Sequence, residues 1–305
     1  MAHLNGELFH WKKLRRVEVD CPFCHANEFS VYERYGEEYQ YSNVQCKKCR
    51  FIYQNPRFEY NQEFLDWAYT WYGDTFITET REKSFEEILQ SALPYFEFKK
   101  NLIDKWVSLK PYRLVDVGCA CGQFLSHCHG KDCVGFGVET SRTQVQFIRD
   151  HLGIETFCGT TGDMKNFQHI FDVTHMAHTL EHVPNPLETL DELISITKPG
   201  GILFIEVPNV ASLKNYFDHL CARWGLRKNT WKPGDFPEHM VEFTTDTLRK
   251  VMKKKGLEIL HFQCHSRSVL RKTNWAKAMD RWVNGMLPVS NNLICVARVF
   301  EAQVQ

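Results

Sequence analysis

Two short cysteine pairs constrain the N-terminal part of this chain more tightly than any other feature of its sequence. The pairs are Cys21-Pro-Phe-Cys24 and Cys46-Lys-Lys-Cys49, and a polar, tyrosine-rich stretch that alternates like a hairpin separates them. Each CxxC turn lets two sulfurs converge on one ion, and four thiolates form a closed tetrahedral zinc site with Zn–S distances of about 2.3 Å. Because a closed site leaves no position for water or substrate, the spacing predicts one structural zinc ion on Cys21, Cys24, Cys46 and Cys49.

The composition bears on the cellular compartment of the protein and on whether it binds nucleic acid. The chain has 12 cysteines, but residues 1–20 contain no apolar signal segment and no run of about 18 apolar residues occurs anywhere. We therefore expect a cytoplasmic protein without an integral membrane segment, in which thiols stay reduced. Lys plus Arg and Asp plus Glu both number 37, so no overall field attracts the chain to nucleic acid.

An aromatic segment follows the cysteine pairs and leads into a predicted helix. Its rings are those of Tyr60, Phe64, Trp67, Tyr69, Trp71, Tyr72 and Phe76. We expect the rings to pack the zinc module onto the rest of the chain, and a cap of Tyr72 or Phe76 over a ligand pocket is the alternative. Residues 84–109 have helical apolar spacing, which Pro94 interrupts.

From residue 112 onward, short apolar strands alternate with amphipathic helices. The predicted strands are 113–117, 134–138, 154–158, 171–176, 202–207, 257–263 and 293–300, and the predicted helices are 143–151, 186–197 and 245–255. This order is typical of an α/β fold with a doubly wound, Rossmann-like, mostly parallel sheet and helices on both faces. We divide the chain into a zinc-binding module (1–60), a helical cover (61–110) and a main domain (111–305).

The loop after the first of these strands indicates a ligand with an anionic group. Gly118, Ala120 and Gly122 allow a tight turn and a close approach of the backbone, and the next helix offers its N-terminal amides. A dinucleotide-binding GxGxxG pattern would need glycine where the chain has Ala120 and Gln123. Glu139 ends the second strand, and an acid there accepts hydrogen bonds from both hydroxyls of an adenosine ribose.

Six motifs in this order resemble those of the class I S-adenosylmethionine-dependent methyltransferases. They are Asp116-Val-Gly-Cys-Ala-Cys-Gly122, Glu139, Phe171-Asp172-Val173, Leu180-Glu-His-Val183, Lys198-Pro-Gly-Gly201 and Glu206-Val-Pro-Asn209. The resemblance covers residues 112–305, and it is sharpest to bacterial enzymes with a two-CxxC zinc module, among them sugar-modifying methyltransferases. The chain departs from the pattern at Ala120, where the family usually has glycine. It also lacks the extra C-terminal domain of the sugar C-methyltransferases, which lowers the expectation of C-methylation.

The resemblance implies S-adenosylmethionine as the cofactor and assigns residues to its site. Along the methionine part would lie Gly118, Cys119, Ala120 and Gly122. The ribose would be held by Glu139, with Thr140 beside it. The further assignments are Asp163 or Met164 beside the adenine, Asp116 supporting the glycine loop or reaching the cofactor amino group through water, and Ala177 at the end of the fourth strand.

Histidines gather after the fourth strand and after a later insertion. Methyl transfer from a sulfonium needs mainly a well-placed nucleophile, and a hydroxyl or amine acceptor benefits from a base of near-neutral pKa. We predict His182 and His239 as the catalytic candidates and expect His175 to be buried packing, while a structural role in the loop is the alternative for His182. A divalent ion on His178, Glu181 and His182 is a further hypothesis, since these positions lie together in a helical turn.

Two more segments lie outside the strand and helix pattern. Residues 210–243 are rich in aromatic and basic side chains and are predicted to form a substrate lid, in which Arg223 or Arg227 would pair with phosphates of a nucleotide-sugar. An ordinary packed helical insertion is the alternative. Residues 275–286 place large apolar side chains on one helical face, which predicts a core cover or a homodimer contact rather than a membrane anchor.

These features predict an enzyme that methylates a hydroxyl or amine of a small molecule, such as a sugar or nucleotide-sugar of a cell-surface glycan or secondary-metabolite pathway. One rival is an RNA methyltransferase, because some ribosomal-RNA guanine methyltransferases also begin with a cysteine zinc module. The neutral net charge disfavours that rival. The other rival is a non-catalytic scaffold, which the intact Gly118, Gly122 and Glu139 disfavour.

Overall fold

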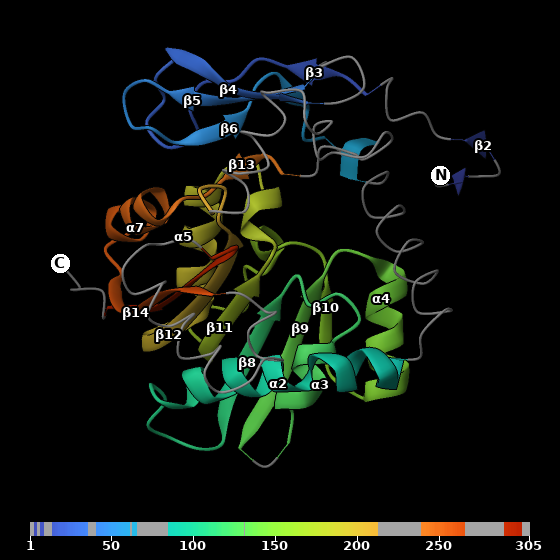
Figure 1. Cartoon of the computed structure of the whole chain (residues 1–305). Coiled ribbons are helices and arrows are strands. Elements are labelled where there is room, and N and C mark those ends of the chain that lie inside the picture. Colours follow the sequence, from blue (N-terminus) through green and yellow to red (C-terminus); the bar gives the residue numbers. More distant parts are fainter. Residues whose placement is uncertain are drawn as a thin grey trace.

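A seven-stranded sheet forms the centre of the main domain, with the strand order β10-β9-β8-β11-β12-β15-β14 (Figure 1). The computed structural model describes residues 3–4, 7–8, 14–35, 41–61, 63–65, 85–130, 132–212, 239–265 and 290–300. The strands of this sheet are β8 Tyr112–Val117, β9 Cys133–Glu139, β10 Thr156–Cys158, β11 Phe171–Ala177, β12 Thr197–Pro208, β14 Glu258–His265 and β15 Asn292–Arg298. Each of the seven strands predicted from apolar runs is confirmed to within a few residues.

The topology brings two loops to one edge of the sheet. Strands β10, β9, β8, β11 and β12 are parallel, and β15 runs antiparallel to β12 and β14. The chain moves outward from β8 to β10 and then returns to the other side of β8 to form β11. The strand order therefore reverses between β8 and β11, and the loops after these two strands are the place where such sheets bind ligands.

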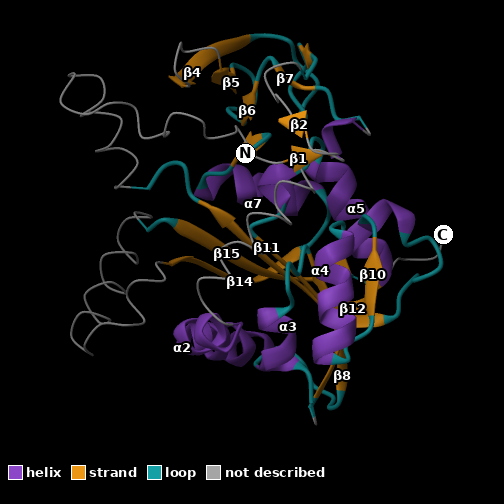
Figure 2. Cartoon of the chain, turned by 90° about the vertical axis from the view of Figure 1, so that its right-hand side faces the viewer, coloured by secondary structure: helices purple, strands orange, loops and turns teal. Residues whose placement is uncertain are grey.

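Helices cover both faces of the sheet, as Figure 2 shows. They are α2 Phe85–Asp104, α3 Gln123–Cys128, α4 Arg142–Phe147, α5 Pro186–Ile196 and α7 Thr245–Lys254, with 3-10 turns at Thr161–Asp163 and Leu180–His182 and a π-helical turn, Ile148–Leu152, extending α4. Side chains alternate across each strand. Leu114 packs in the core under α2 and α3, whereas Val115 and Val117 pack in the core under α5 and α7.

Helix α2 does not break where the sequence predicted an interruption. It continues through Pro94, so that prediction is wrong. A proline inside a helix removes one hydrogen bond and costs about 3 kcal/mol. Beyond the proline the helix buries Tyr95, Lys99, Leu102 and Ile103, and this packing offsets the loss.

The cysteine module forms small sheets that share a core with the main domain. A four-stranded antiparallel sheet has the order β13-β6-β5-β4, from β4 Phe29–Tyr35, β5 Tyr41–Cys46, β6 Ile52–Gln54 and β13 Val241–Glu242. Two-stranded sheets join β3 Arg16–Val17 with β7 Arg57–Phe58 and β1 His3–Leu4 with β2 Glu7–Leu8. The hairpin expected between the cysteine pairs is confirmed as β4 and β5. The boundaries proposed for the domains stay predictions.

Several predicted segments lie outside the described residues. They are residues 213–238 of the predicted lid, the rings from Trp67 to Phe76 and the amphipathic segment 275–286. Within the described ranges, no helix combines the length and the apolar character that crossing a membrane requires.

Candidate functional site

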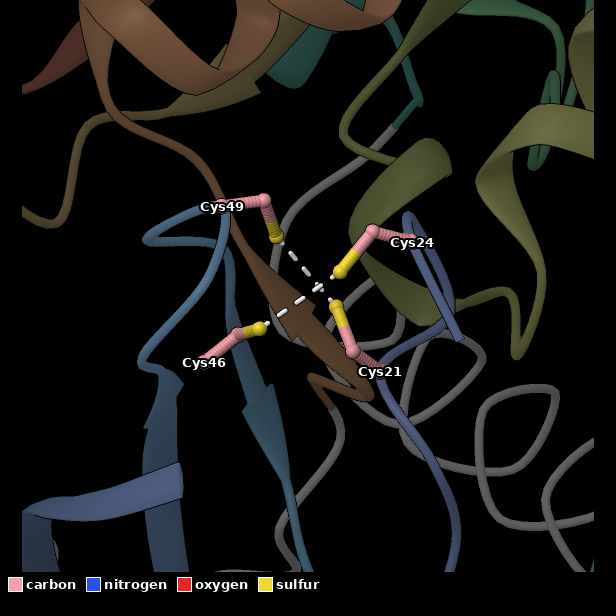
Figure 3. A group of neighbouring side chains, drawn as sticks. All are labelled: Cys21, Cys24, Cys46 and Cys49. Carbon is pink, nitrogen blue, oxygen red and sulfur yellow. Dashed lines mark hydrogen bonds between the residues drawn. The ribbon is translucent and has the colours of Figure 1, made fainter. Parts of the chain in front are cut away.

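The four cysteines of the two CxxC pairs point toward a common centre (Figure 3). Cys21 Sγ lies 3.5 Å from Cys49 Sγ, and Cys24 Sγ lies 3.6 Å from Cys46 Sγ. All four sulfurs lie within 4.8 Å of one another. A tetrahedron with Zn–S bonds of about 2.3 Å has edges of about 3.8 Å. The arrangement of the sulfurs therefore fits the predicted zinc ion.

The backbone around Cys46 favours the form of the thiol that binds metal. Burial raises the pKa of this thiol, but the amides of Cys49 and Lys48 donate hydrogen bonds to the sulfur, and together with the neighbouring thiols they lower its pKa to about 7. The Cys49 thiol responds mainly to burial, and its pKa rises to about 11. Metal ligation requires thiolates, so a bound cation would deprotonate the higher-pKa members of the cluster.

Changing Cys46 to serine tests the zinc assignment. We expect the Cys46→Ser variant to lose stoichiometric zinc and to melt at a lower temperature, because structural zinc contributes directly to the free energy of folding. Cys158→Ser is the matched control, since Cys158 is an exposed free thiol away from the cluster. Metal analysis of both purified proteins decides the matter, and wild-type protein without zinc would refute the assignment.

The glycine loop after β8 is held in a conformation that side chains rarely adopt. Gly118 and Gly122 have φ angles of +72° and +76°, and Ala120 has +50°. A Cβ atom at Gly118 would lie 2.3 Å from Thr179 Oγ1, which is closer than such atoms approach, so only glycine fits there. An alanine in the left-handed region costs about 1–2 kcal/mol. The chain tolerates that cost at Ala120.

Glu139 at the end of β9 connects the glycine loop to the next turn. Its Oε2 accepts a hydrogen bond of 3.0 Å from the Ala120 amide, and its Oε1 accepts bonds from the Thr140 and Ser141 amides at 2.8 and 3.0 Å. A carboxylate has about four lone-pair sites in all. The Thr140 hydroxyl donates a further bond of 3.1 Å to Oε1. Glu139 therefore orders the loop, and the position open to a ligand hydroxyl lies on Oε2, which accepts one bond within the described structure, from the Ala120 amide.

One cavity of about 600 Å³ opens at this edge of the sheet, within the usual volume range of small-molecule sites. One part of its lining comes from the loops after β8 and β9 and contains Gly118, Ala120, Glu139 and Thr140. Another part comes from the turn after β11 and contains His178, Thr179 and His182. Rings from the module side, Tyr60 and Phe64, complete the wall. The cavity thus joins the predicted cofactor residues to one of the two predicted catalytic histidines.

A buried ionic chain lies behind the glycine loop. His175 Nδ1 lies 2.5 Å from Asp116 Oδ1, and Lys99 Nζ lies 3.0 Å from His175 Nε2. Because Lys99 can only donate, His175 accepts at Nε2 and donates at Nδ1 to Asp116. Burial and then the Lys99 charge lower the pKa of His175. The prediction that His175 is buried is confirmed, and this side chain anchors Asp116 rather than facing the cavity.

His178 lies between two buried carboxylates at the cavity wall. Its Nε2 lies 3.2 Å from Glu206 Oε1, and its Nδ1 lies 3.6 Å from Glu181 Oε1. Tyr95 and Asn292 also donate to Glu206. Burial by itself would lower the pKa of His178, but the hydrogen bonds to Glu181 and Glu206 outweigh burial and raise it. His178 is thus held by two buried carboxylates, Glu181 and Glu206, at the cavity wall.

The two predicted catalytic histidines lie against each other. The rings of His182 and His239 meet edge to face, with centroids 5.0 Å apart. His239 Nδ1 also lies 3.0 Å from Glu242 Oε1, and His182 Nε2 lies 3.9 Å from Glu181 Oε1. Only His182 lines the cavity. In the described part of the chain, Glu181, His182 and His239 form a second group that could hold a metal, with His239 in place of the predicted His178.

The other predicted cofactor residues stand close to the lining without belonging to it. They are Asp116, Cys119, Gly122, Asp163, Met164 and Ala177, each next to or a few residues from a lining position, and their roles stay predictions. The sequence analysis missed Gln144, Thr160 and Thr161, which also line the cavity. Their position was an available signal, because Gln144 lies in the first turn of the helix after β9, Thr160 and Thr161 lie just after β10, and this edge of a doubly wound sheet binds ligands.

A comparison with family models matches residues 93–262, more than half of the chain, to a model described as a methyltransferase domain. The ubiquinone biosynthesis O-methyltransferase of Coxiella burnetii is 27% identical over 112 residues, which cover 35% of this chain and 48% of that enzyme. The enzyme of the same name from Azoarcus sp. is 27% identical over 233 residues, covering 74% of this chain and 93% of that enzyme. This chain thus spans about half the length of the first curated relatives it matches.

A solved structure supports the architecture. A chain of the complex between the Haloferax volcanii Trm112 methyltransferase activator and a methyltransferase aligns with a TM-score of 0.50. The alignment covers 80% of this chain and 100% of that chain at 17% identity. At this level of identity the likeness shows a shared fold.

Proposed function

This chain belongs to the class I S-adenosylmethionine-dependent methyltransferases, and we propose that it methylates a hydroxyl group of a small molecule, with His182 as the general base. The observation that carries the proposal is that the glycine loop, Glu139 and His182 line one and the same cavity. A small molecule would have to reach the methyl group inside this cavity. The name of the relatives, ubiquinone biosynthesis O-methyltransferase, supports an oxygen acceptor.

The cofactor half of the cavity is assigned to the loops after β8 and β9. Gly118 lets the glycine loop pack directly on Thr179 of the turn after β11, because a Cβ at this position would lie 2.3 Å from Thr179 Oγ1. Glu139 would accept a ribose hydroxyl at Oε2, which also bonds the Ala120 amide of the glycine loop, while Oε1 is held by the Thr140 and Ser141 amides and the Thr140 hydroxyl. When bound, S-adenosylmethionine supplies a methyl group on a positively charged sulfur that is already a good leaving group.

The acceptor half is assigned to the turn after β11 and to the rings of Tyr60 and Phe64. His182 would take the proton from the acceptor hydroxyl, which makes the oxygen a better nucleophile. The carboxylate of Glu181, 3.9 Å from His182 Nε2, would stabilise the resulting imidazolium. Tyr60 and Phe64 would stack on a flat or ring-shaped acceptor, either a phenol or the apolar face of a sugar.

Screening for methyl transfer tests the function. The wild-type protein would be incubated with S-adenosylmethionine and two panels of acceptors, phenolic hydroxyls and nucleotide-sugars, and mass spectrometry would detect the gain of one methyl group. Methylation in either panel supports the proposal and identifies the acceptor class. Steeply salt-dependent RNA binding together with RNA methylation would favour the RNA rival instead. Failure to bind S-adenosylmethionine would favour a scaffold.

The effect of a chelator on activity distinguishes two hypotheses: His182 as a general base, or a catalytic metal ion bound by Glu181, His182 and His239. If His182 acts as a base, activity should survive a chelator that leaves the zinc of the cysteine module in place. Glu181 is almost fully buried, and its Oε2 has no hydrogen-bond partner among the described residues, so an ion there would satisfy an otherwise orphaned oxygen. Activity that the chelator abolishes and a divalent ion restores, with module zinc retained, would favour the metal.

A further inference from the structure

One short strand, β13, connects the cysteine module to the 3-10 turn Leu180–His182, which we call the catalytic turn. Strand β13 comes late in the chain, directly after His239 and Met240, yet it is the edge strand of the module sheet. Val241 pairs with Tyr53, and Glu242 pairs with Ile52 on β6. Strand β6 begins three residues after Cys49, and β5 ends at Cys46. The strand that carries Glu242 is therefore hydrogen-bonded to a strand that the cysteine cluster holds in place.

Met240 links the module to the turn that carries His182. Its carbonyl accepts a hydrogen bond of 3.0 Å from the Gln54 amide of β6, and its amide donates one of 2.8 Å to the Glu181 carbonyl. The Met240 side chain is fully buried. A single residue thus hydrogen-bonds to both the module and the turn Leu180–His182, and the ring of its neighbour His239 lies edge to face against His182.

Buried rings reinforce the connection. Phe51, two residues after Cys49, meets Phe243 edge to face with centroids 5.7 Å apart, and Phe23 of the first CxxC turn stacks on Phe51 at 5.7 Å. Phe51 and Phe243 are 1% and 0% exposed. On the other side of the turn, Arg57 donates to the Pro184 carbonyl at 2.7 Å. The module therefore contacts the catalytic turn and the residues just after it at two places, near Glu181 through Met240 and at Pro184 through Arg57.

We propose that the cysteine module is a positioning unit of the acceptor half of the site. Through β6, Met240 and the Phe51–Phe243 contact it places His239 against His182 and sets the angle of the His182 ring toward the acceptor. This inference rests on the proposed function, in which His182 meets the acceptor. The cofactor half stands on the loops after β8 and β9, so a disturbance of the module should affect the acceptor more than the cofactor.

Phe51→Leu is the test variant, because it removes the ring contact and keeps the cysteines and an apolar side chain. Phe29→Leu is the matched control, since Phe29 lies on β4 of the same module but is 39% exposed. We expect kcat/KM for the acceptor to fall about tenfold to a hundredfold in Phe51→Leu, as a displacement of about 1 Å does elsewhere. Zinc content should stay stoichiometric and cofactor affinity should stay within about twofold. The control should leave all three unchanged.

Hydrogen exchange supplies a readout that does not depend on an acceptor. The amides of residues 239–243 should exchange faster in Phe51→Leu, and in wild-type protein stripped of zinc, while β8 and β9 keep their protection. If Phe51→Leu does not fold, Phe243→Leu removes the same contact from the other side. Unchanged exchange at residues 239–243 after zinc removal would overturn the proposal, as would a parallel loss of cofactor affinity. If residues 239–243 exchange faster as expected but no acceptor is methylated, the proposed function is refuted and the positioning role of the module is not.

Discussion

Replacing His182 with alanine is expected to lower kcat for the true acceptor about a hundredfold or more, because general base catalysis typically contributes 10²–10⁴-fold. S-adenosylmethionine affinity should remain nearly unchanged, since His182 lines the cavity beyond the glycine loop. The acceptor KM should change less than kcat if the histidine acts mainly on the proton. Steady-state kinetics and calorimetry with the cofactor would measure the two effects separately.

Two further variants make this result specific. His261→Ala on β14 removes a histidine that bonds only Gln263 in the described structure and does not line the cavity, so its kcat should match wild type. His239→Ala should raise the acceptor KM more than it affects cofactor binding, because His239 contacts His182 rather than the cavity. Wild-type turnover in both the His182 and His239 variants would mean that catalysis here is positioning without a base.

Glu139→Ala is expected to weaken S-adenosylmethionine binding by at least tenfold. Hydrogen bonds to a charged group contribute about 1.5–3 kcal/mol each, and the predicted role of Glu139 includes two ribose hydroxyls. A loss of about 1.4 kcal/mol already corresponds to a tenfold change in Kd. The variant also loses the bond to the Ala120 amide, which orders the glycine loop, so the effect on binding should exceed that of the hydroxyls alone.

The control for Glu139 is an acid that the cavity does not use. Glu155→Ala changes an exposed carboxylate just before β10 and should bind the cofactor like wild type. Glu139→Gln keeps the shape and one acceptor oxygen, and its affinity should lie between those of wild type and Glu139→Ala. Calorimetric titration with S-adenosylmethionine gives each Kd, and an unchanged value in Glu139→Ala would remove this residue from the site.

Local sequence patterns were sufficient for the elements of the main sheet and for the loops that they carry. The apolar runs predicted all seven strands of the main sheet, because a strand buried on both faces needs apolar side chains at several successive positions. The glycine loop was predictable because the positive φ of Gly118 and Gly122 is a local requirement that few residues meet. The cysteine cluster was predictable for a similar reason, since two CxxC turns specify four converging ligands.

Pro94 marks the limit of such patterns inside one element. The local rule, that a proline interrupts a helix, failed in α2 because Tyr95, Lys99, Leu102 and Ile103 are buried against distant strands. Lys99 in particular reaches His175 of β11, and nothing in the sequence around either residue indicates the other. Tertiary packing outweighed the local cost of the proline.

The sequence by itself determined the α/β sheet, the glycine loop with Glu139 and the four-cysteine cluster, because each depends on residues close together in the chain. Only the tertiary structure decided that Tyr60 and Phe64 line the cavity and that His239 rests on His182. It also decided that β13 joins the module sheet: two residues, Val241 and Glu242, are too few to show any periodicity. Contacts of this kind depend on where the chain returns in space, and the pairing energy comes from a partner strand that lies far away in the sequence.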